Sequence, residues 1–587
     1  MSNVGDPLDF NDISSFLECA SVTDDLSSLD ALYHHALARS DDLDWLIAQA
    51  YLLWRLSRFK EQLTLLNSLP NSVHSNPQFW LLCGLGLKSI KSDPFEVLDC
   101  YKTAFSLDDS RFDIAFNLAN TYYELNDPSC ESLYMHSLHI NPFNSSCWYN
   151  YSKYLLDNKR YDELRRALKF AILLSPSETD YYCNLGLAFY ANKYWPSAER
   201  SFLISISLES SLYQAYMNLG SLYVSSRRLP EALSVLHESV ELASQTTHSS
   251  QSLFHLGLCH LLLGKYSTGW ALYQHRLYSG LVPLSSAPTS GILIESFQQL
   301  LDCKGSSVVV WAEQGFGDCI QFSRYLPLLT QLDISFQFYC HPSLVPLISH
   351  WLDCSFPVTP IPPHCLIDDF RPHFPLLSFP FLLSTTLDSI PSSIPYLTPP
   401  RLIPRPDHLK IPDAPGGLSV GLVWASNSLN TLMYSNKSIP LNLLFDIFNP
   451  LISNDLINIH SLQVGADSNL LNPYLQDNRV FDWSSKINNF SDTAFLVDQL
   501  DLVISIDTSV SHLSAAVNCP TWLLLPFDSD FRWLSDRHDS PWYPNVMRLF
   551  RQSDRDDWSS VIQELQLAFN RLFLVDIAAL DSSDSPI

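Results

Sequence analysis

Residues 184–202 read NLGLAFYANKYWPSAERSF, and residues 218–236 read NLGSLYVSSRRLPEALSVL, so the same pattern returns after 34 residues. Each stretch places a Leu-Gly pair one turn before an aromatic residue, then an alanine and a large apolar residue four positions later. A small residue lets two antiparallel helices approach closely, and apolar residues at helical spacing supply a shared stripe. The pattern therefore predicts packed helix pairs repeated along the chain.

Looser copies of this pattern occur in the rest of the N-terminal half. They begin at Cys83-Gly84, Leu118-Ala119, Tyr151-Ser152 and Leu256-Gly257, with a degenerate first copy near Trp45. The repeat resembles the tetratricopeptide repeat, with about seven copies between Asp41 and Tyr278. This resemblance implies an α-helical repeat array, a superhelix whose concave surface binds peptides or partner proteins.

Asparagine recurs at one register of the repeat, two residues before the small residue. The four positions are Asn117, Asn150, Asn184 and Asn218. In some arrays of this kind the register faces the concave surface, where an amide can hydrogen-bond an extended peptide. Simple exposure to solvent explains the recurrence equally well, and the sequence leaves both interpretations open.

Composition limits the functions that the chain can have. Hydrophobic residues make up 46% of its 587 residues and charged residues 16%, which is enough apolar material for several packed domains. The net charge of −26 argues against general binding to nucleic acid or to an anionic membrane surface. A small basic pocket for a phosphorylated ligand is compatible with this charge.

Cysteine spacing and the N-terminal sequence indicate the cellular compartment of the protein. Thirteen cysteines occur without any CxxC spacing, which favours buried reduced thiols. The acidic N-terminus lacks the basic and apolar regions of a signal peptide, and no apolar run approaches the length of a membrane span. We therefore expect a cytoplasmic protein with no transmembrane segment.

The period changes after about Ser279, where short β-branched runs alternate with helical segments. The predicted strands are Ser307–Ala312, Ile334–Tyr339, Leu418–Trp424, Ile457–Leu462, Leu502–Ile506 and Thr521–Leu525. The predicted helices are Asp318–Leu329, Leu344–Trp351, Leu441–Phe448, Thr493–Leu500 and Val510–Val517. This alternation predicts parallel sheets covered by helices. Eight prolines between Pro391 and Pro415 suggest a connector between two α/β domains, whose facing strand ends would form a cleft.

The first motif that could carry chemistry is Glu313-Gln314-Gly315-Phe316-Gly317-Asp318, between a predicted strand and a predicted helix. Gly315 and Gly317 permit tight turning of the backbone, and amides at the helix start can face an anion. Asp318 occupies a predicted N-cap position. A structural cap and a catalytic carboxylate are both consistent with this motif.

Two further motifs suit a phosphorylated ligand. Asp507, Thr508, Ser509 and His512 lie at another strand-to-helix junction, where hydroxyls and amides favour a diphosphate, although an ordinary capping sequence is the alternative. Lys437 follows the Leu418–Trp424 strand in a lysine-poor region and is either a phosphate contact or a solvated surface residue.

Asp528-Ser529-Asp530 has the DxD spacing of a metal site under a nucleotide diphosphate. The motif is short, and Asp530 could instead cap the following helix. No zinc-ligand spacing, GxSxG or Walker motif occurs in the sequence. We therefore predict no metal cofactor.

Six segments in order resemble tetratricopeptide-repeat proteins that carry a heptosyltransferase-like (family 9) glycosyltransferase domain. They are VVWAEQGFGDCIQFSRYLPLL, GLVWASN, NKSIPL, HSLQ, DLVISIDTSVSHLSAA and PFDSDFRWLSDRHDSPWYP, between about Ser306 and Phe550. The resemblance implies a GT-B fold, that is, an α/β fold of two Rossmann-like domains. The first domain binds the acceptor and the second mainly the nucleotide-sugar donor.

The same resemblance implies roles for individual residues. Asp318 matches the base that deprotonates the acceptor, within the loop that holds Gly315 and Gly317. The donor-binding matches are Lys437, Gln463, Asp507, Thr508, Ser509 and His512, with Arg532 as a further contact to donor charge. Gln463 stands near a ribose-binding glutamate of that family, and Ser509 replaces its usual glycine. The implied reaction is an inverting sugar transfer without a metal.

We thus expect an N-terminal segment at 1–40, repeats at 41–280, an acceptor-side domain at 281–400, a connector at 401–415, a donor-binding domain at 416–575 and a flexible acidic tail at 576–587. The predicted function is an inverting glycosyltransferase that modifies a protein or glycan acceptor held on the repeat surface. The alternatives are a repeat scaffold with an inactive transferase-like domain, a nucleotide-sugar sensor, and an enzyme resembling the protein O-GlcNAc transferases.

Overall fold

The computed structural model describes residues 13–38, 42–244, 246, 249–280, 287–288, 290–352, 356–361, 367, 369–400, 403–412, 416–428 and 431–574. The chain divides into two compact units, Met1–Asn218 and Leu219–Ile587. The predicted acidic tail at 576–587 lies outside the described residues, as do parts of the connector at 401–415. Within the described ranges, no helix has the length and apolar character needed to cross a bilayer.

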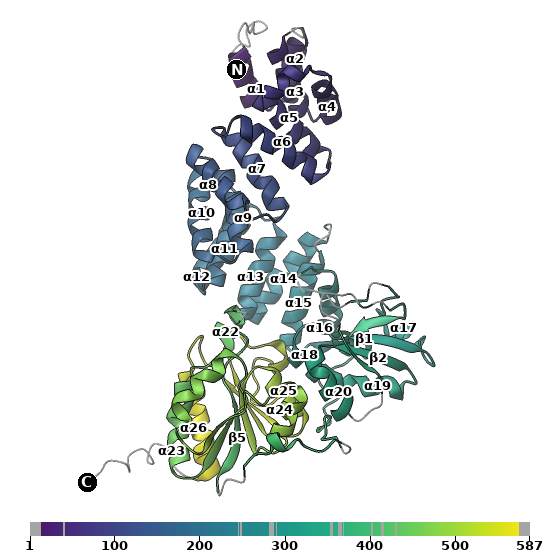
Figure 1. Cartoon of the computed structure of the whole chain (residues 1–587), viewed down its shortest axis with the longest axis vertical. Helices are drawn as coiled ribbons and strands as arrows, with labels where there is room; N and C mark the ends of the chain where they lie inside the picture. The colour runs from purple at the N-terminus through teal and green to yellow at the C-terminus, as the bar shows by residue number, and fades with distance from the viewer. Residues whose placement is uncertain are drawn as a thin grey trace, which may run out of the picture. The chain divides into compact units, whose positions relative to one another are not determined.

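The first unit is built from helices joined by short turns (Figure 1). They are α1 Ile13–Val22, α2 Leu26–Leu37, α3 Leu43–Arg55, α4 Phe59–Ser68, α5 Pro77–Ser89, α6 Pro94–Leu107, α7 Phe112–Glu124, α8 Cys130–Ile140, α9 Ser145–Asp157, α10 Tyr161–Leu174, α11 Thr179–Ala191 and α12 Trp195–Leu208. From α3 onward each odd-numbered helix packs against the helix that follows it. Helices α1 and α2 lie in the predicted N-terminal segment, before the first predicted repeat.

The backbone of each repeat turn is the same. A non-glycine residue with positive φ follows the first helix of successive pairs, at Ser57, Lys91, Asn126, Lys159, Lys193 and Arg227, with φ between 56° and 61°. The small residue of the repeat also has the predicted role, because a Cβ atom on Gly186 would lie 2.4 Å from Cε1 of Phe202. Repeated turns and repeated close packing confirm the tetratricopeptide-like array.

The second unit begins with the last helices of the array. These are α13 Tyr213–Ser225, which crosses the boundary between the units, α14 Leu229–Ala243, α15 Ser249–Leu262 and α16 Tyr266–Tyr273. A Cβ atom on Gly220 would lie 2.5 Å from Cγ of Leu236, so the packing of the first unit continues here. Helix α15 packs against both α16 and the 3₁₀ turn Gln274–Leu277, which leads into the first α/β lobe.

The first lobe contains a four-stranded parallel sheet of order β3-β2-β1-β4. Its strands are β1 Ser307–Trp311, β2 Ser335–Cys340, β3 Val358–Pro360 and β4 His373–Pro375. Its helices are α17 Phe297–Leu301, α18 Phe316–Phe322, α19 Leu326–Gln331, α20 Val345–Trp351 and α21 Phe379–Leu382. The single helix predicted over Asp318–Leu329 is wrong, because a 3₁₀ turn at Ser323–Tyr325 separates α18 from α19. Pro327 has no amide hydrogen, so it suits the first turn of a new helix rather than the interior of a longer one.

The second lobe contains a six-stranded sheet of order β10-β9-β8-β5-β6-β7, again with only parallel neighbours. Its strands are β5 Leu418–Val423, β6 Ile457–Ser461, β7 Val480–Asp482, β8 Leu502–Ile506, β9 Thr521–Leu525 and β10 Met547–Arg551. Its helices are α22 Thr431–Lys437, α23 Leu441–Ser453, α24 Phe490–Val497, α25 Ser509–Ala516 and α26 Ser559–Phe573. The order reverses between β5 and β8, and such a switch point opens a crevice at the strand ends.

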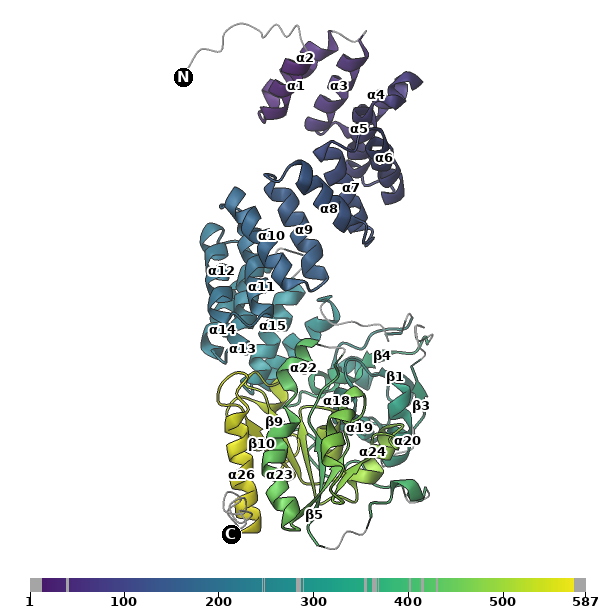
Figure 2. The same ribbon diagram turned by 60° about the vertical axis from the view of Figure 1, so that its left-hand side comes forward.

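Helices cover both faces of this second sheet. Helices α23 and α26 lie side by side on one face (Figure 2), where Leu444 and Leu565 are buried against Val420 and Ile504 of the central strands. Helices α24 and α25 lie on the other face, with α25 packed against β8 and β9. The predicted parallel sheets wrapped by helices are therefore confirmed for both lobes.

Candidate functional site

A cavity of about 460 Å³ lies at the switch point of the six-stranded sheet. It is lined by residues that directly follow three strands: Ala425 after β5, Gln463 after β6 and Thr508 after β8. Phe316 and Ser343 of the first lobe line the same cavity. Its volume lies in the range of small-molecule sites, and its place agrees with the rule for ligands on parallel sheets.

The first turn of α25 borders this cavity. Thr508 is the N-cap, with an extended backbone (φ −135°), and Thr508, Ser509 and Val510 all line the cavity wall. Amides at the start of a helix have no partner inside the helix, and their partial positive charge favours an anion. The predicted positions of Thr508 and Ser509 at a helix N-terminus are confirmed.

Gln463 is occupied by contacts inside the second lobe. Its Oε1 accepts hydrogen bonds from the amides of Trp424, at 3.2 Å, and Ala425, at 3.0 Å. Its Nε2 donates to the carbonyl of Val464 at 3.2 Å. Gln463 therefore joins the ends of β5 and β6 and forms part of the cavity wall, while its predicted contact with a ribose stays a prediction.

Asp318 is the third residue of α18 and not its N-cap, so the predicted position is wrong. The N-cap is Gly315, and Oδ2 of Asp318 accepts a hydrogen bond from the Gly315 amide at 2.9 Å. Glycine has no side chain to cap with, so the carboxylate one turn later serves the start of the helix instead. The other oxygen, Oδ1, accepts a hydrogen bond from Nη2 of Arg532.

The two glycines of the motif act differently from the prediction. The residue with positive φ is Gln314, at 61°, whereas Gly315 has a φ of −84° and Gly317 is helical. The absence of a side chain at Gly317 matters for another reason, since a Cβ atom there would lie 2.9 Å from Cδ2 of His512. Gly317 thus lets α18 of the first lobe approach α25 of the second.

Arg532 connects the two lobes. It lies in the 3₁₀ turn Phe531–Trp533 after β9 and pairs with Asp318, with its Nη1 2.6 Å from Oδ1 of Asp530 and its Nε 2.7 Å from Oε1 of Gln321. Burial alone would lower the pKa of Arg532, but the two carboxylates outweigh burial and raise it. Burial raises the pKa of Asp318, against the opposing effect of Arg532. The arginine therefore stays charged and holds the Asp318 carboxylate in place.

Asp530 caps the turn that carries Arg532, because its Oδ1 accepts the Arg532 amide at 3.0 Å. Oδ2 of Asp528 lies 3.4 Å from Nδ2 of Asn436. Throughout the described part of the chain, no group of three or more His, Cys, Asp or Glu side chains is arranged to hold a metal ion. The hydrogen bond to the Arg532 amide confirms that Asp530 caps the following turn.

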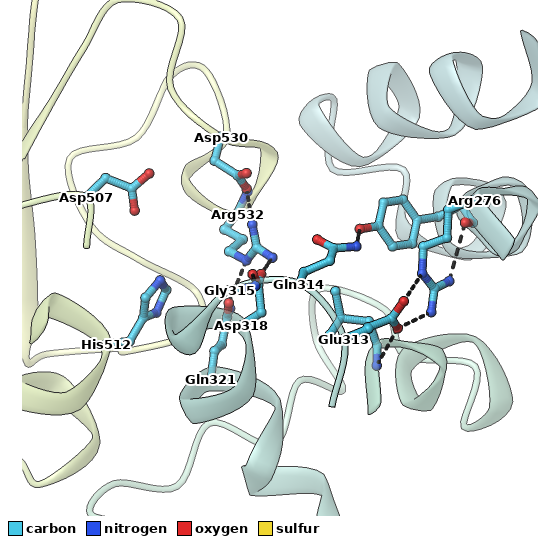
Figure 3. A network of polar contacts seen from close by, with 12 residues as sticks. Arg276, Glu313, Gln314, Gly315, Asp318, Gln321, Asp507, His512, Asp530 and Arg532 are labelled. Carbon is cyan, nitrogen blue, oxygen red and sulfur yellow. Dashed lines mark hydrogen bonds and ion pairs between the residues drawn. The ribbon is translucent and has the colours of Figure 1, made fainter. Parts of the chain in front are cut away.

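Lys437 and Asp507 form a second ion pair, with Nζ 2.7 Å from Oδ2. Burial alone would lower the pKa of Lys437, but Asp507 outweighs burial and raises it. Lys437 ends α22 and Asp507 follows β8, so the pair joins two elements of the second lobe. Figure 3 shows Asp507 and His512 on the second-lobe side of the Asp318–Arg532 pair. The predicted lysine therefore has a protein carboxylate as its partner.

His512 is a buried, neutral imidazole. Its Nδ1 lies 2.9 Å from the hydroxyl of Tyr543, and its ring stacks on Trp533 with centroids 5.3 Å apart. Burial, with the nearby Arg532 and Arg324, lowers the pKa of His512 well below its usual value. The structure thus brings His512 of α25 beside Gly317 of α18.

Sequence reasoning missed the link between the last repeat and this site. Arg276, in the 3₁₀ turn after α16, donates from Nε to Oε2 of Glu313 at 3.0 Å and from Nη2 to Oε1 at 2.5 Å (Figure 3). Nε2 of Gln314 also donates to the hydroxyl of Tyr273 at 2.9 Å. Glu313 and Gln314 stood inside a recognised motif, but nothing in the sequence pointed to partners some 40 residues earlier.

Comparisons with known proteins give limited matches. No family model matches the chain. Protein FlbA of Caulobacter vibrioides is 25% identical over 311 residues, which are 49% of this chain and 49% of FlbA, so the chain spans about half the length of this curated relative.

Two of the solved structures that match the chain each cover about a third of it. PilF of Pseudomonas aeruginosa is 22% identical and covers 35% of this chain and 92% of its own, with a TM-score of 0.31. YrrB, described as a TPR protein with an unusual peptide-binding site, is 16% identical and covers 33% of this chain and 95% of its own, with a TM-score of 0.28. These TM-scores are low, and the repeat fold rests on the helix pairs of the chain itself.

Proposed function

We propose that the chain is an inverting glycosyltransferase of GT-B type that moves a sugar from a nucleotide-sugar donor to a protein or glycan acceptor. The observation that supports this most directly is the cavity at the switch point of the six-stranded sheet. Its lining includes the start of α25 and Phe316 of the other lobe, which is two residues from Asp318. The order of the motifs along the chain supports the same proposal.

In the proposed reaction, residues of each lobe have a separate role. The acceptor hydroxyl attacks the anomeric carbon, and the bond from that carbon to the diphosphate oxygen breaks with inversion. Asp318 accepts the hydroxyl proton, for which a carboxylate oxygen has a second lone pair beside each existing hydrogen bond. The amides of α25 and Lys437 stabilise the leaving nucleoside diphosphate.

The repeat array would present the acceptor. The recurring asparagines are half-buried, and three of their amides are used inside the array: Nδ2 of Asn117 donates to the Asp113 carbonyl at 2.8 Å, Nδ2 of Asn150 to Oδ1 of Asn120 at 3.0 Å and Nδ2 of Asn218 to Sγ of Cys183 at 3.4 Å. Their carbonyl oxygens can still accept hydrogen bonds. An extended acceptor peptide along this register is therefore the form of partner that we propose.

One observation favours a second candidate, a repeat scaffold with an inactive transferase-like domain. Both charged groups needed for the chemistry are already paired within the protein, Asp318 with Arg532 and Lys437 with Asp507. A domain that has lost its donor could keep these pairs for stability alone. An enzyme resembling the protein O-GlcNAc transferases differs from our first proposal only in donor and acceptor.

Donor binding and turnover separate the two candidates. The full chain is mixed with UDP-, GDP- and ADP-sugars, and its melting temperature and the release of nucleoside diphosphate are measured. A donor at 100 times its Kd stabilises the folded state by about 2.7 kcal/mol. Lys437→Met should abolish the response, while Lys410→Met, at an exposed position in the connector, should retain it. If no nucleotide sugar changes the melting temperature or is turned over, the scaffold function stands.

A further inference from the structure

A second, smaller cavity lies between the repeats and the loop after β9. Its volume is about 70 Å³, and its polar lining includes Arg227, from the turn after α13, and Asp528 and Ser529 of that loop. It shares no lining residue with the cavity at the ends of β5, β6 and β8. At about 10–15 Å³ per water, this space holds roughly five waters or one anion of phosphate size.

Arg227 lines this cavity, and Arg551 lies next to it through its hydrogen bond to the lining residue Ser529. Arg227 stacks on the ring of Phe527, with its Cζ 4.4 Å from the ring centroid, and its buried Nη2 has no hydrogen-bond acceptor among the described residues. Arg551, the last residue of β10, donates to the hydroxyl of Ser529 and, at 3.0 Å, to the carbonyl of Trp533. Neither arginine has a carboxylate oxygen within 4.0 Å in the described parts of the chain.

Unpaired arginines are unusual in so acidic a chain. Acidic residues outnumber basic ones 61 to 35, and buried charges are normally paired because their desolvation costs free energy. Burial, together with the neighbouring Arg227, lowers the pKa of Arg551 to about 10 against the opposing effects of Asp536 and Asp507. Burial also lowers the pKa of Arg227, against Asp536 and Asp528. The two cations therefore repel each other in a partly desolvated place.

We infer that this cavity binds a phosphoryl group at the guanidinium group of Arg227 and the hydroxyl of Ser529, with Arg551, bonded to that hydroxyl, as a neighbouring positive charge. Guanidinium groups present several N–H donors in a plane, a geometry that matches phosphate oxygens. A third arginine, Arg555, lies beside the same ring, with its Cζ 5.5 Å from the Phe527 centroid, and adds positive potential. The phosphoryl group comes either from free phosphate or from a phosphorylated small molecule such as a nucleotide.

The site would tie the repeats to the loop that holds Arg532. Arg227 belongs to the turn between α13 and α14, whereas Ser529 directly precedes Asp530, which pairs with Arg532. A bound phosphoryl group therefore bridges a repeat turn and the segment that reaches Asp318. This inference is independent of the proposed sugar transfer, because it concerns a separate cavity.

The test measures the melting temperature and calorimetric binding of the full chain with inorganic phosphate, against chloride at equal ionic strength. Phosphate should give a saturable rise in the wild type, and Arg227→Met or Arg551→Met should weaken binding at least tenfold. Arg228→Met is the matched control, because Arg228 lies in the same turn but pairs with Glu231. ADP in place of phosphate distinguishes the source: tighter ADP binding that Arg227→Met also weakens indicates a nucleotide, and equal binding indicates free phosphate.

Melting in phosphate-free buffer separates an anion site from a structural arginine. Removal of one of two repelling cations should leave the melting temperature of Arg227→Met unchanged or higher. A fall of several degrees in that buffer would show that Arg227 is structural and would overturn the inference. It would also be overturned by a wild-type response to phosphate no larger than that to chloride, or by an equal loss in Arg228→Met. If Arg551→Met does not fold, Arg227→Met decides the outcome alone.

Discussion

Removing Glu313 should destabilise the junction between the last repeat and the first lobe. Its side chain and that of Arg276 are both 0% exposed, and two hydrogen bonds join them. Glu313→Leu leaves the guanidinium buried with the hydroxyl of Ser378 and the carbonyl of Tyr273 as its remaining partners. Breaking a buried ion pair by removing one partner costs about 3–5 kcal/mol, because the other charge stays desolvated.

The double variant Arg276→Met/Glu313→Leu should be more stable than the single variant. It removes both charges and replaces them with apolar side chains, which buried pairs often tolerate. The assay is hydrogen exchange of the full chain, read on peptides that cover β1 and the 3₁₀ turn Gln274–Leu277. If exchange follows the local opening equilibrium, lowering the free energy of opening by about 3–5 kcal/mol should speed exchange there by about 10²- to 10⁴-fold in the single variant. Peptides from α7 in the first unit serve as the internal control.

The reasoning would be refuted by equal exchange in the single and double variants, since the cost would then come from lost packing and not from an uncompensated charge. It would also be refuted by wild-type exchange in Glu313→Leu. An intermediate result is informative as well, because the amide of Leu377 also donates to Glu313 Oε1, at 3.3 Å, and loses its acceptor in both variants.

Three further predictions concern His460 and two glycines. Burial lowers the pKa of His460 from 6.5 to about 4, so the folded chain binds fewer protons there than the unfolded chain. The stability present above pH 6.5 therefore falls by up to about 3 kcal/mol as the pH drops to 4. His460→Gln should reduce the difference between the melting temperatures at pH 7 and pH 5. Gly317→Ala should cost about 1–3 kcal/mol in urea unfolding through its clash with His512, and Gly317→Ala/His512→Ala should lose less than the two single costs combined. Gly186→Ala should cost a similar amount through Phe202, and an unchanged midpoint would contradict the close packing of the repeat.

The repeats could be predicted from sequence because their information is local. Gly186 and Phe202 lie 16 residues apart, and the same pair of types returns at Gly220 and Leu236. Each turn also has a residue with positive φ, such as Lys193. Because this residue is not glycine, its type does not indicate that conformation from sequence. Repetition, rather than the strength of any single copy, made the prediction possible.

The sheets could be predicted only in part. Strands β8 and β9 agree with the predicted Leu502–Ile506 and Thr521–Leu525, because apolar β-branched and leucine-rich runs identify central parallel strands. Strand β10, Met547–Arg551, was missed, since it carries two arginines. Strands β3, β4 and β7 have three residues each, too few for a pattern to stand out.

The site residues could be predicted as positions but not as pairs. Asp318 and Arg532 are 214 residues apart, and their contact exists only because the two lobes face each other. The same is true of Gly317 and His512, which meet across that junction. Sequence indicates which side chains follow a strand, whereas the partner of each depends on how one sheet is placed against another.

These pairs set the order in which a donor would bind under the proposed function. To reach Lys437, the diphosphate must first break the ion pair between Lys437 and Asp507, whose atoms are 2.7 Å apart. The first-turn amides of α25 have no intrahelical bond to break. Contact should therefore begin at Thr508 and Ser509, and Lys437 should turn to the phosphate only afterwards. Arg532 stays with Asp530 throughout, because that carboxylate also caps its own turn. The Asp318 carboxylate keeps Arg532 as its partner and takes the acceptor proton on a free lone pair, so the Asp318–Arg532 pair positions the base and bears on the chemistry rather than on donor binding.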